Sequence, residues 1–208
     1  LSVVHPAAGN IGGGGFMVIR FSNGTVTTID FREVAPSGAY RDMFLDDSLN
    51  VIPGKSLYTA FAAGVPGTVS GFGYAHRKYS TKPWDYLVSP AIDLARDGFK
   101  LTTRDARYLN YAHKFLLRDK EASKIFASKN NYRVGDLFIQ TDLSHTLKRI
   151  SINGDKEFYT GLTSRMIERC MSRTGGIISR EDLLNYQPVE REPIEFSYRG
   201  YKVYSMPP

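Results

Sequence analysis

An apolar run and then an alternating run of hydrophobic and polar residues lie within residues 15–32, and together they predict a β-hairpin. Two runs rich in β-branched and aromatic residues flank Asn23-Gly24, a pair that is favoured in type I′ hairpin turns. Successive side chains of a strand point to opposite faces, so the second run has two faces. One face carries Thr27, Ile29 and Phe31, and the other carries Val26, Thr28, Asp30 and Arg32. The predicted hairpin therefore ends with a guanidinium group next to a half-buried strand.

Apolar residues at helical spacing predict a mainly helical region over residues 66–186. A long loop over residues 33–65 is expected before it, because turn residues recur there. Pro90 and Gly98 are expected to interrupt or end the first long helix. The longer helices are predicted from four apolar stripes: Trp84 to Phe99, Tyr108 to Leu116, Leu143 to Ile150 and Leu162 to Cys170.

The last part of the chain predicts a short helix and a pair of strands. Ser179 and Asp182 fit a capping box, which predicts a helix that ends near Tyr186. Two closing strands are expected within residues 191–206, on either side of a turn. The order of strands, helices and strands predicts an α+β or layered fold in a single domain, with helices packed on a sheet.

The composition narrows the class of protein. The 208 residues are 42% hydrophobic and 12% aromatic, which is enough for an ordinary packed core. No stretch approaches the roughly 18 apolar residues of a membrane-spanning helix, so no transmembrane segment is predicted. The net charge of +6 could suit an anionic partner, but the basic residues are scattered among acidic ones, which predicts no nucleic-acid partner. A secreted or periplasmic protein that handles a small anion fits this charge equally well.

Most residues that could carry chemistry have a simpler structural explanation. The only cysteine, Cys170, excludes an internal disulfide, and its apolar neighbours at helical spacing predict a buried small hydrophobe. Asp46 and Asp47 lie in the predicted loop, where a solvated turn explains them. No metal site and no cofactor are predicted, because none of the four histidines has metal-ligand spacing: His5, His76, His113 and His145.

Four consecutive glycines, Gly12 to Gly15, invite comparison with a phosphate-binding loop. The comparison fails because no Lys-Ser or Lys-Thr follows and because the next segment is a strand rather than a helix. The glycine run is therefore predicted to be structural, and to allow either close backbone approach or a positive φ at the entrance to the strand.

Arg32 is the candidate binding residue. Its guanidinium offers a rigid fork of donors that suits a carboxylate bidentately. The alternative is a surface ion pair with Asp30 or Glu33, which contributes at most about 1 kcal/mol. The pattern of residues alone leaves both explanations open.

Several stretches, taken together, resemble the large subunit of the gamma-glutamyltransferases, also called gamma-glutamyl transpeptidases or glutathione hydrolases. They keep the family's order and spacing from one end of the chain to the other. Three blocks are specific in combination: the glycine run, Phe31-Arg32-Glu33 and Gly64-Val65-Pro66-Gly67-Thr68. The stretches are GNIGGGGFMVIRF (9–21), IDFREVAPSGAYRDMFLDD (29–47), AAGVPGTVSGF (62–72), PWDYLVSPAIDLARDGF (83–99), GGIISREDLLNYQPVEREPI (175–194) and YRGYKVYSMPP (198–208).

The resemblance implies an N-terminal-nucleophile hydrolase fold, a layered αββα sandwich of which this chain would be an incomplete fragment. In this family the precursor cleaves itself, and the freed threonine at the head of the small subunit is the nucleophile. That threonine would lie outside this chain, so no catalytic residue is expected here and the fragment alone is expected to be inactive. Both ends of the chain look cut, which agrees with this expectation.

The implied activity is cleavage of the γ-glutamyl amide of glutathione and related compounds, through a γ-glutamyl-enzyme intermediate that passes to water, an amino acid or a peptide. The implied partners are this substrate and the small subunit, in a heterodimer. Arg32 occupies the position of the family arginine that binds the α-carboxylate of the γ-glutamyl group. A periplasmic or secreted location is expected. The open alternatives are a depolymerase of poly-γ-glutamate or an acylase with the same fold, or an inactive binding fragment.

Overall fold

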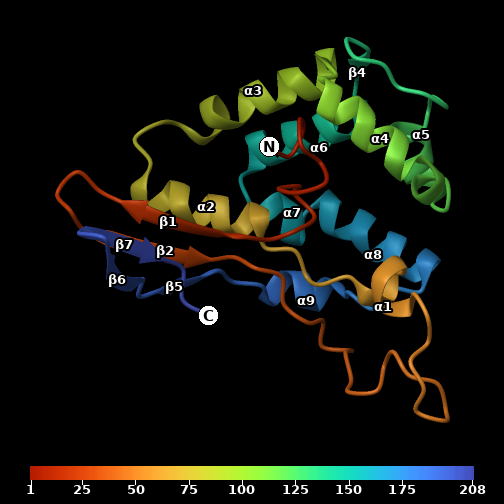
Figure 1. Ribbon diagram of the computed structural model, residues 1–208, viewed down its shortest axis with the longest axis horizontal. Coiled ribbons are helices and arrows are strands. Elements are labelled where there is room, and N and C mark those ends of the chain that lie inside the picture. The colour runs from red at the N-terminus through yellow and green to blue at the C-terminus, as the bar shows by residue number, and fades with distance from the viewer.

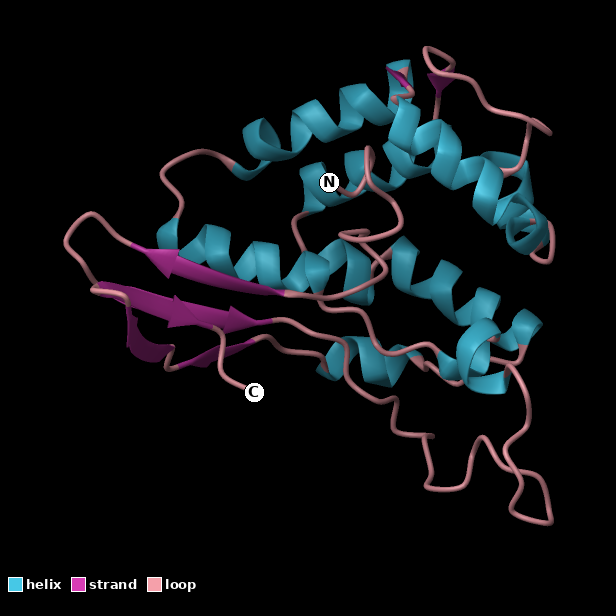
Figure 2. Cartoon of the chain, in the orientation of Figure 1, coloured by secondary structure: helices cyan, strands magenta, loops and turns pink.

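Two antiparallel strands confirm the predicted hairpin in the computed structural model, which describes residues 1–208 (Figure 1, Figure 2). Strand β1 (Phe16–Arg20) pairs with β2 (Val26–Asp30). A third strand, β5 (Val189–Arg191), pairs with the other edge of β2, which makes β2 the central strand. The sequence does not predict β5, because three residues are too few to show an alternation of hydrophobic and polar positions.

The turn of this hairpin differs from the predicted type I′ turn at Asn23-Gly24. The Phe21 carbonyl accepts a hydrogen bond from the Gly24 N–H at 3.0 Å, and the Phe21 N–H donates to the Thr25 carbonyl at 2.9 Å. Gly24 has a φ of 90°, whereas Asn23 lies outside the left-handed region. The loop is therefore a bulged three-residue loop, which needs only one left-handed residue, rather than a type I′ turn, which needs two.

The two predicted closing strands, β6 (Ile194–Tyr198) and β7 (Tyr201–Ser205), pair antiparallel but form a separate two-stranded sheet. The two residues between them have positive φ, 48° at Arg199 and 81° at Gly200. A type I′ turn requires positive φ at both central residues. The type I′ turn of this chain is therefore found here and not in the first hairpin.

Most helices lie above and to the right of β1, β2, β5, β6 and β7 in Figure 1. Helix α2 packs on β2, α3 packs against α6, and α7 contacts α6, α8 and α9. The loop predicted over residues 33–65 contains the short helix α1 and a 3₁₀ helix, η1. The bounds are α1 (Lys55–Tyr58), η1 (Ala60–Ala62), α2 (Thr68–Tyr79), α3 (Trp84–Asp97), β3 (Phe99–Lys100), α4 (Thr103–Leu116), α5 (Lys120–Phe126), β4 (Leu137–Phe138), α6 (Thr141–Asn153), α7 (Lys156–Thr160), α8 (Leu162–Thr174) and α9 (Arg180–Asn185).

Helix α3 continues through Pro90, although the sequence predicts an interruption or an end there. Proline has no N–H to donate to the carbonyl of Tyr86, one turn earlier. The Ser89 hydroxyl donates to that carbonyl instead, at 3.1 Å, so the carbonyl keeps a partner. The helix ends at Gly98, as predicted, and this glycine has a φ of 82°.

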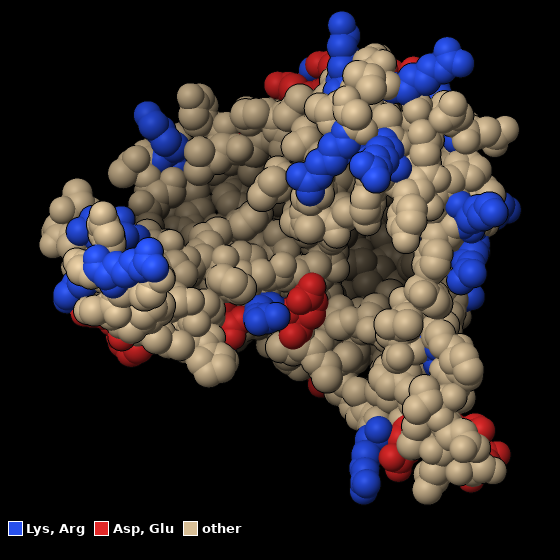
Figure 3. Space-filling model, viewed as in Figure 1, with Lys and Arg blue, Asp and Glu red and all other residues tan.

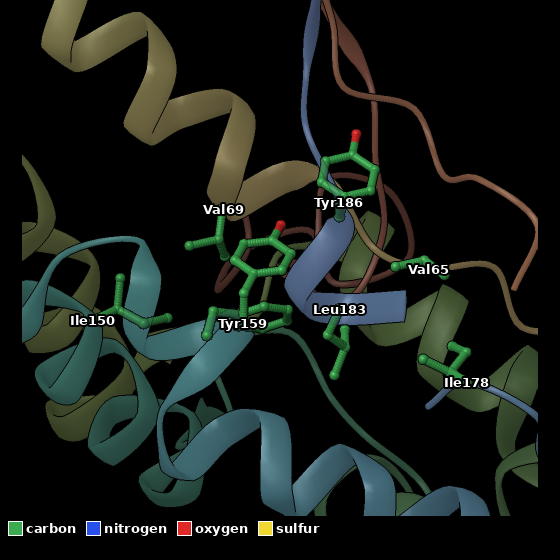
Figure 4. Packing of buried hydrophobic residues seen from close by; sticks show 8 residues of the cluster. Val65, Val69, Ile150, Tyr159, Ile178, Leu183 and Tyr186 are labelled. Carbon is green, nitrogen blue, oxygen red and sulfur yellow. The ribbon is translucent and has the colours of Figure 1, made fainter. Parts of the chain in front are cut away.

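The largest core cluster packs the start of α2 against α6, α7 and the segment around α9 (Figure 4). Its members come from the segment before α2, from α2, α6, α7 and α9, and from the segments that flank α9. Leu183 is fully buried, and Tyr159 stacks on Tyr186 with 5.8 Å between ring centroids and 12° between ring planes. The cluster therefore fixes the start of α2 relative to the last helices. It consists of Val65, Val69, Ile150, Phe158, Tyr159, Ile178, Leu183 and Tyr186.

The predicted capping box is present at the start of α9. The Ser179 hydroxyl accepts a hydrogen bond from the Asp182 N–H at 3.1 Å, and the Asp182 carboxylate accepts one from the Ser179 N–H at 2.8 Å. The same carboxylate accepts a hydrogen bond from the Ser37 N–H at 2.7 Å. Burial by itself would raise the pKa of Asp182, but the N–H groups of Ser179 and Ser37 lower this pKa to about 2.

We expect Asp182→Ala to destabilise the protein by about 1–2 kcal/mol at neutral pH, because the helix and the loop lose one shared acceptor. The folded-state pKa of about 2 lies below the ordinary value of 3.8, so this stabilisation is present above about pH 4 and is lost as the pH falls through about 2. Urea unfolding of the complete protein should therefore show a larger difference between variant and wild type at about pH 7 than at about pH 3. Equal differences at the two pH values would contradict this assignment.

Candidate functional site

Arg32 lies two residues beyond the end of β2, and its exposed guanidinium makes no ion pair. Asp30 pairs instead with Arg191 of β5, with 2.8 Å between Oδ2 and Nε, and Glu33 forms no ion pair either. The carbon of the Arg32 guanidinium lies 5.9 Å from the centre of the Phe16 ring. The alternative explanation, a surface ion pair of Arg32 with Asp30 or Glu33, is therefore wrong. The guanidinium remains available to a ligand.

Asp30 is kept as an anion by its neighbours. Burial by itself would raise the pKa of Asp30, but the Arg32 N–H and the Arg191 guanidinium hold this pKa below its usual range. The carboxylate is therefore charged at neutral pH. Because the charge is engaged by Arg191, it does not pair with the Arg32 guanidinium.

The backbone of Arg32 is held on three sides, although its side chain is free. Its N–H donates to Asp30 Oδ1 at 3.1 Å, and its carbonyl accepts a hydrogen bond from the Tyr186 hydroxyl at 2.9 Å. Gly14 packs directly against it: a Cβ on Gly14 would lie 2.8 Å from the Arg32 Cα and 2.6 Å from the Phe31 carbonyl oxygen. The base of the Arg32 side chain therefore occupies a defined position.

The glycine run brings three backbone segments together. Gly15 exchanges both backbone hydrogen bonds with Phe31, at 3.2 and 2.9 Å, and this pair continues the hairpin. The Gly13 carbonyl accepts a hydrogen bond from the Gly67 N–H at 2.9 Å, just before α2. None of the four glycines has a positive φ. Of the two predicted reasons for the run, close backbone approach is the one that is confirmed.

A cavity of about 440 Å³ opens beside the glycine run and the end of β2. Its lining includes Gly14, Phe16 and Phe31 but not Arg32 itself. The Thr68 hydroxyl, also in the wall, is buried and has no hydrogen-bond partner. Figure 3 shows that this face of the molecule is hollowed between the helices at the top and the strands below. Arg32 therefore lies next to residues of the cavity wall without forming part of the wall.

Two larger hollows lie away from Arg32. An apolar groove of about 650 Å³ includes residues of α4 and of the β3–β4 pair. A polar hollow of about 750 Å³ is lined by residues of α2, α3 and α6, and it contains two ion pairs, Arg77 with Asp155 at 2.8 Å and Arg96 with Asp93 at 3.0 Å. The structure contains no group of three or more His, Cys, Asp or Glu side chains that could hold a metal ion.

The other residues considered for chemistry, Cys170 and Asp46, have no catalytic or binding arrangement around them. Cys170 is partly exposed, so the prediction of a buried cysteine is wrong; Ile167 and Met171 are the residues of α8 that pack on the core. Asp46 organises an exposed turn, because its Oδ1 accepts hydrogen bonds from the N–H groups of Ser48 and Asn50, each at 2.9 Å. Among the helices, none combines the length and the apolar character needed to cross a bilayer.

Tyr186 is the residue of this site that the sequence does not reveal. It is predicted only as the end of a helix, yet its hydroxyl binds the backbone of Arg32 from 154 positions away. No periodicity or motif connects two positions so far apart, so only the tertiary structure brings them together.

Comparisons with known proteins agree over the whole chain. Residues 1–208 match the family model described as Gamma-glutamyltranspeptidase. The chain is 49% identical over 210 residues to the glutathione hydrolase proenzyme of Escherichia coli K12, and the match covers 100% of this chain and 36% of that relative. The crystal structure of Helicobacter pylori gamma-glutamyltranspeptidase superposes with a TM-score of 0.96 at 48% identity, and the match covers 100% of this chain and 60% of that one.

A more distant match indicates how widely this fold is shared. The Bacillus anthracis transpeptidase enzyme CapD superposes with a TM-score of 0.80 at 33% identity, over 100% of this chain and 64% of that one. The helices and strands described above are part of the N-terminal-nucleophile hydrolase fold, as predicted. The chain spans 36% of the length of the curated relative from Escherichia coli. It belongs to the gamma-glutamyltranspeptidase family, of whose large subunit it forms a part.

Proposed function

We propose that the complete protein that contains this chain is a γ-glutamyltransferase, which cleaves the γ-glutamyl amide of glutathione and related compounds. The observation that carries this proposal is Arg32, an unpaired guanidinium on a backbone that is held on three sides. Its proposed partner is the α-carboxylate of the γ-glutamyl group. The match of the whole chain to the family supports the proposal.

The proposed contact is a bidentate ion pair. A planar guanidinium can donate two parallel hydrogen bonds to the two oxygens of a carboxylate. Hydrogen bonds to charged groups contribute roughly 1.5–3 kcal/mol each. In a site shielded by the rest of the protein, such a pair would anchor the glutamyl end of the substrate and orient its γ-amide toward the nucleophile.

The nucleophile in this proposal is a threonine of the small subunit. Its hydroxyl oxygen attacks the γ-carbonyl carbon while the hydroxyl proton passes to the threonine's own amine, and two backbone N–H groups stabilise the oxyanion. The amide C–N bond then breaks, the leaving amine takes up the proton, and a γ-glutamyl ester remains on the threonine. Water or the amine of an amino acid or peptide attacks this ester, which releases glutamate or a new γ-glutamyl amide.

The proposed partner of this chain is the small subunit that self-cleavage of a common precursor would release. The word proenzyme in the names of relatives supports a precursor. We further propose that the protein is exported to the periplasm or secreted, which its basic charge of +6 allows.

We expect the complete protein to hydrolyse glutathione with a kcat/KM at least about tenfold higher than that for poly-γ-glutamate. The reason is that the chain is 49% identical, over its whole length, to a relative named as a glutathione hydrolase proenzyme. The measurement is the rate of glutamate release from each substrate. A preference for the polymer would favour a depolymerase, and no turnover of either substrate would favour a binding protein without activity.

A further inference from the structure

A buried tyrosine connects the last helix to the backbone of Arg32. Tyr186 directly follows α9, is 8% exposed, and donates its hydroxyl proton to the Arg32 carbonyl oxygen at 2.9 Å. We propose that Tyr186 is a positioning residue, which holds the Arg32 backbone so that the guanidinium can bind the substrate α-carboxylate. This inference rests on the function proposed above.

The ring of Tyr186 has little freedom to move. It stacks on the ring of Tyr159, with 5.8 Å between centroids and 12° between planes, and Figure 4 shows the two hydroxyl groups pointing to the same side. The Tyr159 hydroxyl donates to the Pro66 carbonyl at 2.9 Å and accepts a hydrogen bond from the Ser70 N–H at 3.1 Å. The ring of Tyr159 is therefore fixed both to the segment just before α2 and to the first turn of α2. The Tyr186 hydroxyl oxygen therefore has a defined position.

The Tyr186 hydroxyl acts as a donor throughout the pH range of an ordinary assay. Burial raises its pKa above the usual value, and the negative charges of Asp30 and Glu33 raise this pKa further. The hydroxyl therefore stays protonated. Its proton is directed at the Arg32 carbonyl, which would lose its partner if the hydroxyl were removed.

The position of the backbone decides how well the guanidinium can bind. The Arg32 guanidinium makes no ion pair or hydrogen bond to another side chain, and its carbon lies 5.9 Å from the centre of the Phe16 ring, so no polar contact within the chain fixes its direction. A displacement of its backbone is carried along the side chain to the guanidinium. Because bidentate binding requires two N–H groups to be aligned at once, a small displacement weakens substrate binding more than it weakens the fold.

The test is Tyr186→Phe in the complete protein, assayed with γ-glutamyl-p-nitroanilide. We expect the KM to rise about three- to tenfold while kcat stays within about twofold, because substrate binding is affected and the nucleophile is not. The matched control is Tyr132→Phe. Tyr132 is 4% exposed and its hydroxyl also has a partner, the Ser128 hydroxyl at 2.9 Å, but it lies in a different core cluster. Tyr132→Phe should lower Tm without changing KM.

The decisive measurement is the same substitution in an Arg32→Ala background. Without a guanidinium to position, Tyr186→Phe should change KM by less than about twofold. If Tyr186→Phe raises KM by the same factor with and without Arg32, or leaves KM unchanged in the protein that retains Arg32, the positioning role is overturned. If Arg32→Ala itself leaves KM unchanged, the proposed role of Arg32 fails, and the role of Tyr186 fails with it. Subunit formation and Tm, measured for every variant, separate these results from a loss of folding.

Discussion

Replacing Arg32 with alanine in the complete protein is expected to raise the KM for γ-glutamyl-p-nitroanilide by about 100- to 1,000-fold. Two charge-assisted hydrogen bonds to the substrate would be lost, each of roughly 1.5–3 kcal/mol. The fold should tolerate the change, because the side chain is exposed and makes no ion pair. The measurement is steady-state kinetics, together with gel analysis of the two subunits to show that self-cleavage is intact.

Two controls show whether the lost contact is the proposed one. Arg32→Lys keeps the charge but not the planar fork, so its KM should fall between those of wild type and Arg32→Ala. A substrate whose α-carboxylate is converted to an amide should be turned over with a similar KM by wild type and Arg32→Ala. An unchanged KM for the ordinary substrate in Arg32→Ala would remove this residue from the site.

The second large effect is expected at Gly67, and it should act on folding rather than on KM. A Cβ at this position would overlap the Phe31 carbonyl oxygen and the Tyr186 hydroxyl. Phe31 is 5% exposed and Tyr186 is 8% exposed, and hydrogen bonds hold both, so neither can move aside easily. We expect Gly67→Ala to destabilise the protein by more than about 3 kcal/mol and to reduce the yield of mature subunits severely.

The control for this prediction is Gly12→Ala, in the glycine run. Gly12 is exposed, does not have a positive φ, and a Cβ there would meet only the side-chain oxygen of Asn10, at 3.5 Å. Its effect on stability should stay within about 0.5 kcal/mol. Comparing Tm and the yield of cleaved subunits distinguishes the two sites. A mature Gly67→Ala protein with the wild-type Tm would show that this contact does not constrain the fold.

Local patterns predict much of the secondary structure of this chain. The hairpin, the capping box at Ser179 and the end of α3 at Gly98 depend on residues that are close in sequence. The predictions are wrong where a distant or unexpected partner intervenes. Strand β5 (Val189–Arg191) exists because it pairs with β2. Where α3 passes Pro90, which has no N–H to donate, the Ser89 hydroxyl binds the Tyr86 carbonyl.

The candidate site shows the same difference between what nearby residues predict and what distant partners decide. The motif around Arg32 identifies it as the candidate binding residue, but the motif does not show whether Asp30 or Glu33 neutralises it. Arg191, brought alongside by β5, takes Asp30 and leaves the Arg32 guanidinium unpaired.

The sequence by itself determined the family, the main helices, the hairpin and the candidate arginine, because these depend on motifs and on periodicity within short segments. Only the tertiary structure decided which charges pair and what holds the Arg32 backbone. Asp30 meets Arg191 across 161 positions, and Tyr186 meets Arg32 across 154. Contacts over such distances form only when the core brings the segments together, and no local pattern encodes them.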